Sequence, residues 1–214
     1  MIGLLTTVTE PFGRVTMHGV REEILEAQAE AAGLPLVRVA IPSPCPNEVY
    51  EQSMRAAVEK AGSQGVTAMV FGDLFLEDVR AYRERQLAGT GIAPIFPLWL
   101  EPTRSLAEAM IAAGLVAHVT CVDPTRLPAS LAGRVFDRDF LDELPAEADP
   151  CAERGEFHTC VSAGPMFARP IPVEKGETVL RDGFLFTDLR LSSLQPRIAE
   201  DRPCARSLPS PPCS

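Results

Sequence analysis

The chain has 214 residues, of which 46 % are hydrophobic, and its formal net charge is −9. This apolar content indicates a globular protein with a core rather than a disordered chain. The acidic balance argues against partners bound through bulk positive charge, so neither nucleic acid nor an anionic membrane surface is expected as a partner.

Apolar runs alternate with helical patterns over the first 122 residues. Strands are predicted at 2–8, 36–41, 67–73, 92–99 and 115–122, and helices at 18–32, 47–62, 75–89 and 103–113. This alternation predicts an α/β fold with a doubly wound parallel sheet, covered by helices on both faces. Ligands bind such sheets at the carboxyl ends of the strands. A site is therefore expected among the loops 6–9, 40–46, 72–77 and 122–125.

The pattern changes after Pro124. A short acidic helix is followed by three strand-like runs, which predicts a small α+β domain over 125–191 behind an α/β domain over 1–124. Residues 192–214 contain five prolines and few apolar residues, so a disordered tail is expected there.

The run FGDLFLED (71–78) concentrates acidic residues behind a predicted strand. Gly72 lets the backbone approach a ligand, Asp73 lies at the carboxyl edge of the sheet, and Glu77 lies in the first turn of a helix. Such carboxylates suit Mg²⁺ or the orientation of a substrate amine. The alternative is a solvated helix that begins with acidic residues.

The run CAERGEFHTC (151–160) places Glu153, Glu156 and His158 around Gly155. In a strand beginning at residue 156, Glu156 and His158 face the same side, where a carboxylate and an imidazole can transfer protons. A solvated strand face is the alternative. The cysteines nearby lack zinc-ligand spacing, so no metal site of the protein itself is predicted. His18, at the entry to a helix, is either a structural polar residue or lies near a bound phosphate.

No stretch of about 18 apolar residues predicts a membrane span, and the first residues do not form a signal peptide. We therefore expect a cytoplasmic protein with its six cysteines as reduced thiols. The common phosphate-loop, hydrolase and zinc-protease motifs are absent from the sequence.

Four runs in this order, GLLTTVTEPFGRVTMHGVREEILEAQAEAAGLPL, VFGDLFLEDVRAYRERQLAGTGIAPIFPLW, CVDP and DPCAERGEFHT, resemble the diphthamide synthase family. This family, also described as diphthine–ammonia ligase, belongs to the PP-loop adenine nucleotide α-hydrolase superfamily. The resemblance implies that ATP, with Mg²⁺, adenylylates a carboxylate and that ammonia then displaces AMP to form an amide. The family's acceptor is diphthine on elongation factor 2. The GEFHT run resembles a bacterial-type branch, for which a different small-molecule or modified-protein carboxylate is expected.

The family begins with a strand and an SGGKDS phosphate loop, which this sequence lacks. Residue 1 corresponds to the start of the family's second strand. We therefore expect a truncated gene model whose chain binds ATP poorly. The alternatives are a non-catalytic remnant that acts as a binding protein and a PP-loop relative with other acceptor chemistry, such as tRNA thiolation.

Matched position by position, the resemblance assigns three groups of residues. Nucleotide binding is implied for Leu5, Thr6, Thr7, His18 and Gly72, and contact with the acceptor for Glu153, Gly155 and Thr159. The third group is inferred to be catalytic and consists of Asp73, Glu77 and Glu156, which match family positions, together with His158, which lies in the same run as Glu156. Within the last group, Asp73 and Glu77 are expected to serve Mg²⁺ or ammonia, and Glu156 and His158 to transfer protons.

Overall fold

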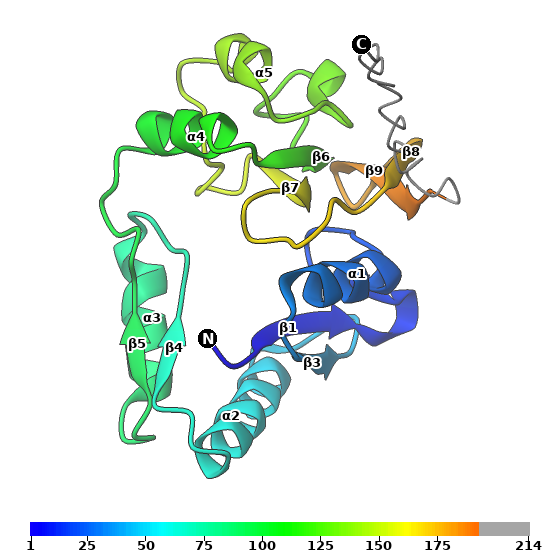
Figure 1. Cartoon of the computed structure of the whole chain (residues 1–214). Coiled ribbons are helices and arrows are strands. Elements are labelled where there is room, and N and C mark those ends of the chain that lie inside the picture. Colours follow the sequence, from blue (N-terminus) through cyan, green and yellow to red (C-terminus); the bar gives the residue numbers. More distant parts are fainter. Residues whose placement is uncertain (193–214) are drawn as a thin grey trace, which may run out of the picture.

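The computed structural model describes residues 1–192, so nearly all of the predicted tail lies outside the described residues. Five α-helices and nine strands follow one another in this part of the chain (Figure 1). The strands are β1 (Leu4–Thr9), β2 (Arg14–Val15), β3 (Leu36–Ile41), β4 (Ala68–Val70), β5 (Ala93–Ile95), β6 (Val116–Val122), β7 (Phe157–Ala163), β8 (Val173–Arg181) and β9 (Phe184–Leu191). The helices are α1 (Glu22–Ala32), α2 (Asn47–Ser63), α3 (Glu77–Leu87), α4 (Thr103–Ala112) and α5 (Arg138–Glu143), with short 3₁₀ turns at Glu10–Phe12 and Ala129–Leu131.

Local sequence signals account for several element boundaries. Helix α1 ends at Ala32, and the following Gly33 adopts φ +65° and donates its backbone N–H to carbonyls of the last turn, as is typical of a glycine that ends a helix. Helix α2 begins at Asn47, but Pro46 occupies the N-cap position and no side chain caps the helix. On the exposed face of α3, Arg80 Nε lies 2.9 Å from Glu84 Oε1, the i,i+4 pair that the spacing favours.

The strands form three small sheets, and a doubly wound parallel sheet is not evident in residues 1–192. One sheet has the order β2-β1-β3, with β1 and β3 parallel, and a second consists of the parallel pair β4-β5. The third has the order β7-β6-β9-β8 and is antiparallel throughout. The fold is thus mixed α/β, and the prediction of a single parallel sheet needs correction.

Strand β6 shows why periodicity misled the prediction of strand pairing. Five of its seven residues are buried, the near-continuous burial that is typical of a parallel strand covered on both faces. In the structure β6 pairs antiparallel with β7 and β9, and its burial comes from helices and loops of the carboxyl-terminal half. Burial of a strand does not specify the direction of its partner.

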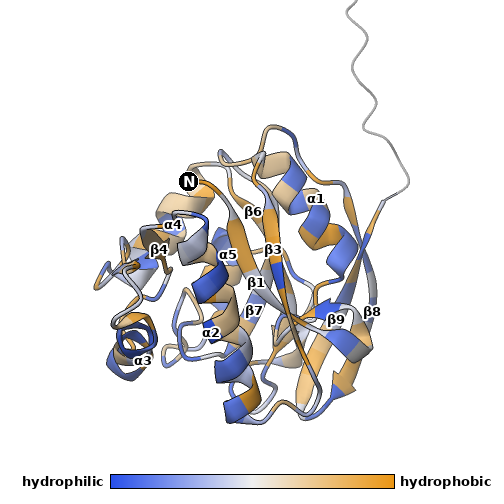
Figure 2. Ribbon diagram, turned by 90° about the horizontal axis from the view of Figure 1, so that it is seen from below, coloured by the Kyte–Doolittle hydropathy of each residue, from blue (hydrophilic) through white to orange (hydrophobic). Residues whose placement is uncertain are grey.

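The largest core cluster lies between α4, α5 and strands β6 and β7. Its centre is Phe140, which is fully buried and contacts the rings of Phe136 and Phe157. A smaller cluster packs Val20 and Ile24 against the four-stranded sheet. Figure 2 shows β3 as largely apolar and α3 as largely hydrophilic. No helix within residues 1–192 is long and apolar enough to cross a membrane.

Candidate functional site

Glu153 joins the two acidic runs that the sequence singled out. Its Oε1 accepts hydrogen bonds from the backbone N–H groups of Leu74, at 2.7 Å, and Phe75, at 3.4 Å. The neighbouring Arg154 guanidinium lies 5.2 Å from the Phe75 ring centroid. Glu153 therefore anchors the loop between β4 and α3, the loop that carries Asp73.

The segment around Glu153 is itself held by a buried carboxylate. Asp149 Oδ2 accepts hydrogen bonds from the backbone N–H groups of Glu153, at 2.8 Å, and Cys151, at 3.2 Å. Gly155, with φ +76°, takes the left-handed conformation that turns the chain toward β7. These contacts make residues 149–156 a compact turn whose acidic side chains point inward.

Glu156 is fully buried, at 0 % exposure. Its Oε1 accepts from the Asp149 backbone N–H at 3.1 Å and pairs with Arg126 Nη2 at 3.2 Å, whereas its Oε2 has no hydrogen-bond partner among residues 1–192. The partners of Glu156 are thus Arg126 and Asp149, although the sequence suggested that Glu156 and His158 act together. Its burial favours a positioning role over direct contact with a substrate.

His18 and His158 are 140 residues apart in the sequence, and their rings lie in contact at a tilted angle. Their ring centroids are 4.6 Å apart, at an interplanar angle of 51°. Burial lowers the pKa of His158 to about 4, with a further contribution from His18. Burial also lowers the pKa of His18, and a hydrogen bond with the Thr159 backbone partly offsets this effect. Both imidazoles are consequently neutral at pH 7.

Asp73 lies in the loop that Glu153 anchors, and its charge is already paired. Its Oδ2 is 3.5 Å from Arg83 Nε, and neither atom has a hydrogen-bond partner within the described chain. Glu77 is exposed in the first turn of α3, and Gly72 is exposed with open space around its α-carbon. No group of three or more His, Cys, Asp or Glu residues suited to a metal ion occurs in residues 1–192.

The remaining predicted residues belong to β1. Leu5, Thr6 and Thr7 are half-buried there and pair with Val37, Arg38 and Val39 of β3. A cavity of about 370 Å³ opens beyond the carboxyl ends of β1 and β3, where the β8–β9 hairpin forms the opposite wall. Its lining includes Thr9, Arg14, Ser43, Cys121, Arg181 and Phe186.

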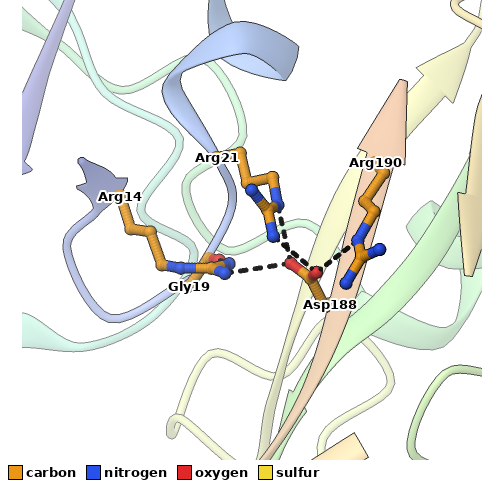
Figure 3. A network of polar contacts seen from close by, with 5 residues as sticks. All are labelled: Arg14, Gly19, Arg21, Asp188 and Arg190. Carbon is orange, nitrogen blue, oxygen red and sulfur yellow. Dashed lines mark hydrogen bonds and ion pairs between the residues drawn. The ribbon is translucent and has the colours of Figure 1, made fainter. Parts of the chain in front are cut away.

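Asp188 of β9 forms one edge of this cavity and holds three arginines (Figure 3). It accepts from Arg14 Nη2 at 3.0 Å, from Arg21 Nε at 2.9 Å and Nη2 at 2.8 Å, and from Arg190 Nε at 3.0 Å. These hydrogen bonds, with that of Arg21 the strongest, hold the pKa of Asp188 well below its usual range. Sequence reasoning missed this network because its members are up to 174 residues apart.

The fold and these buried polar groups define a mixed α/β protein. Its ligand-sized cavity lies between residues 9–45 and the β8–β9 hairpin. Residues 102–190 match the family model described as the diphthamide synthase C-terminal domain. This segment runs from α4 to β9 and carries Glu153, Glu156 and His158, so the match supports the resemblance to the diphthamide synthase family over this part of the chain. No curated protein matches the chain.

Proposed function

We propose that the chain acts in diphthamide synthesis or a closely related reaction, as an ATP-dependent, AMP-forming amide ligase. The observation that carries this proposal is the family match over residues 102–190, which includes the turn 149–156 and the strand with His158. In the reaction, a carboxylate oxygen of the acceptor attacks the α-phosphorus of ATP and pyrophosphate leaves. Ammonia then attacks the carbonyl carbon, AMP leaves with the carboxylate oxygen, and the new amide nitrogen loses a proton.

The neutral imidazoles of His18 and His158 are suited to the second step. A neutral imidazole offers a lone pair that accepts a hydrogen bond from ammonia, or a proton from the nitrogen once it has attacked. An imidazolium ion has no such lone pair and would repel the ammonium ion from which ammonia forms. The burial that keeps both rings neutral at pH 7 therefore supports a role beside the attacking nitrogen.

Glu153 and Glu156 serve as positioning residues in this proposal. Glu153 fixes the loop with Gly72, Asp73 and Glu77 against the turn that precedes His158. The nucleotide lies near this loop and near β1, where Leu5, Thr6 and Thr7 are placed. The carboxylates of residues 1–192 form no cluster for a metal, so in this proposal Mg²⁺ binds together with ATP, whose phosphates supply most of its ligands. Gly155 and Thr159 lie on the acceptor side.

The acceptor in this proposal is a small-molecule or modified-protein carboxylate, with diphthine of elongation factor 2 as the first to test, and the reaction takes place in the cytoplasm. A second candidate function is a binding protein without catalysis. The engagement of Asp73 with Arg83 and of Glu156 with Arg126 favours it, because predicted catalytic carboxylates already have partners within the fold.

Formation of AMP separates the two functions. The full chain is incubated with ATP, Mg²⁺, ammonium and elongation factor 2 bearing diphthine, and AMP is quantified with each component omitted in turn. The ligase predicts AMP that depends on both acceptor and ammonium, and a His158→Gln rate lower by about 100-fold, within the range for a lost acid–base group. His118→Gln is the matched control, since His118 is also half-buried but binds Ser162 at 3.0 Å. Absence of AMP in every mixture contradicts ligase activity of this chain, which is the result expected if the SGGKDS loop is indispensable, and it favours the binding protein.

A further inference from the structure

The cavity of about 370 Å³ beyond β1 and β3 combines apolar walls with unused arginine donors. We infer that it binds an organic anion consisting of a planar apolar ring and one carboxylate or phosphate group. This inference does not rest on the proposed ligase reaction. The volume lies in the range of about 300–1,000 Å³ that small-molecule pockets occupy.

Aromatic side chains supply the surface for a ring. Phe12, Phe184 and Phe186 all line the cavity, and Val179 adds an aliphatic face. Phe12 and Val179 are 55 % and 42 % exposed, so a ligand resting on them removes apolar surface from water. A β-carbon at Gly19 would lie 2.8 Å from the Phe186 ring, so a residue without a side chain is required where this segment packs against Phe186.

Two guanidinium groups face the cavity with donors to spare. A guanidinium group carries five N–H donors. Arg14 donates one to the Gly19 carbonyl, at 2.6 Å, and one to Asp188, at 3.0 Å. Arg181 forms no side-chain hydrogen bond or ion pair with residues 1–192, and its guanidinium carbon lies 5.8 Å from the Phe12 ring centroid. Together they can grip a carboxylate or phosphate with charge-assisted hydrogen bonds.

The charges around the cavity favour an anion even though the chain as a whole is acidic. Asp182 and Asp188 line the cavity together with Arg14 and Arg181, so its lining carries two acidic and two basic side chains. Asp188, however, is shared with Arg21 and Arg190 behind the wall. Asp188 is thus shared among three arginines, which leaves guanidinium donors of Arg14 and Arg181 for an anion. Hydroxyl groups of Thr9 and Thr16, which lie 3.1 Å apart, add neutral donors at its rim.

Calorimetric titration of the full chain tests the inference with three probes. 2-Naphthoate carries a ring and a carboxylate, 2-naphthalenemethanol the same ring without charge, and adenosine monophosphate a ring and a phosphate. We expect saturable binding of at least one anion, weaker binding of the alcohol, and weakening by salt. Preference between naphthoate and the nucleotide tells whether the natural ligand is a carboxylate or a phosphate. Equal binding of naphthoate and the alcohol, or binding of none, overturns the inference.

Two pairs of variants place the binding in this cavity. Arg181→Gln should weaken the anion about tenfold, because one charge-assisted hydrogen bond is lost at a solvent-facing position, whereas Arg85→Gln on the exposed face of α3 should leave it unchanged. Val179→Asp should weaken it about fivefold relative to Val179→Asn, which has the same size but no charge. Unchanged affinity in Arg181→Gln or equal affinity in the Val179 pair contradicts this location.

Discussion

Replacement of Asp188 by Asn tests the junction between the amino-terminal segment and β9. The Asp188 side chain is 14 % exposed and accepts four hydrogen bonds from three arginines. Asn has nearly the same shape, but it offers one oxygen instead of two, carries no charge and directs N–H donors toward guanidinium groups. Arg14, Arg21 and Arg190 then repel one another without a counter-ion.

The expected loss of stability follows from these contacts. A hydrogen bond to a charged group contributes about 1.5–3 kcal/mol, but solvent screens arginines that are 27–54 % exposed. Loss of two such bonds, discounted for this screening, predicts a decrease of about 3 kcal/mol in the free energy of unfolding. For a chain of this size that corresponds to a Tm lower by roughly 6–12 °C.

Urea and thermal unfolding followed by circular dichroism measure this change. Asp182→Asn is the matched control, because Asp182 is exposed at a turn with φ +49°, a conformation that Asn also tolerates, and it should stay within about 0.5 kcal/mol of wild type. The low pKa of folded Asp188 means that its contribution is complete above about pH 4 and is lost at lower pH, where the unfolded carboxyl binds its proton first. The acid-induced decline should therefore be shallower in Asp188→Asn. A loss below about 1 kcal/mol would refute the reasoning.

Three further predictions concern other buried groups. The pKa of folded His158 is lowered to about 4, so the unfolded state binds more protons below pH 6.5. The free energy of unfolding should therefore be about 2 kcal/mol lower at pH 5 than at pH 8. His158→Gln, measured by urea unfolding, should remove most of that difference. Phe140→Ala empties the centre of the main core and should cost about 3–5 kcal/mol in the same assay, whereas Val116→Ala, at an exposed strand position, should cost less than about 1 kcal/mol. Burial raises the pKa of Cys121 to about 11 and of Cys160 to about 12, so peptide mapping after iodoacetamide treatment at pH 8 should find Cys45 modified well before either; equal rates would contradict this burial.

Every strand and helix predicted between residues 2 and 191 has a counterpart in the structure, because each depends on nearby residues. Strand β3 has the predicted bounds of 36–41, and α1 ends at residue 32 as expected. Pairing between strands depends on residues that are far apart, and it was not predictable in the same way. The last strand, β9, enters the sheet between β6 and β8.

In the candidate site, too, individual residues could be predicted from the sequence, whereas their contacts with distant residues could not. Glu153 and His158 were recognised as functional candidates from their own segment, but the contact of Glu153 with Leu74 and that of His158 with His18 span 79 and 140 residues of chain. Nothing local marks Asp188 as the centre of an arginine network. The roles assigned to Asp73, Glu77 and the β1 residues remain predictions, as do ATP and Mg²⁺ as ligands.

The position of β9 near the carboxyl terminus also determines when contacts of the amino-terminal segment can form during synthesis. Arg21 must wait for Asp188, which is 167 residues further along the chain, and at 5–20 residues per second the ribosome takes roughly 10–30 s to supply it. Throughout this interval Val20 and Ile24 lack Leu189, the strand β9 residue that covers them in the finished molecule. The packing around Val20 and Ile24 is therefore completed only near the end of translation, and until then these apolar side chains are accessible to chaperones.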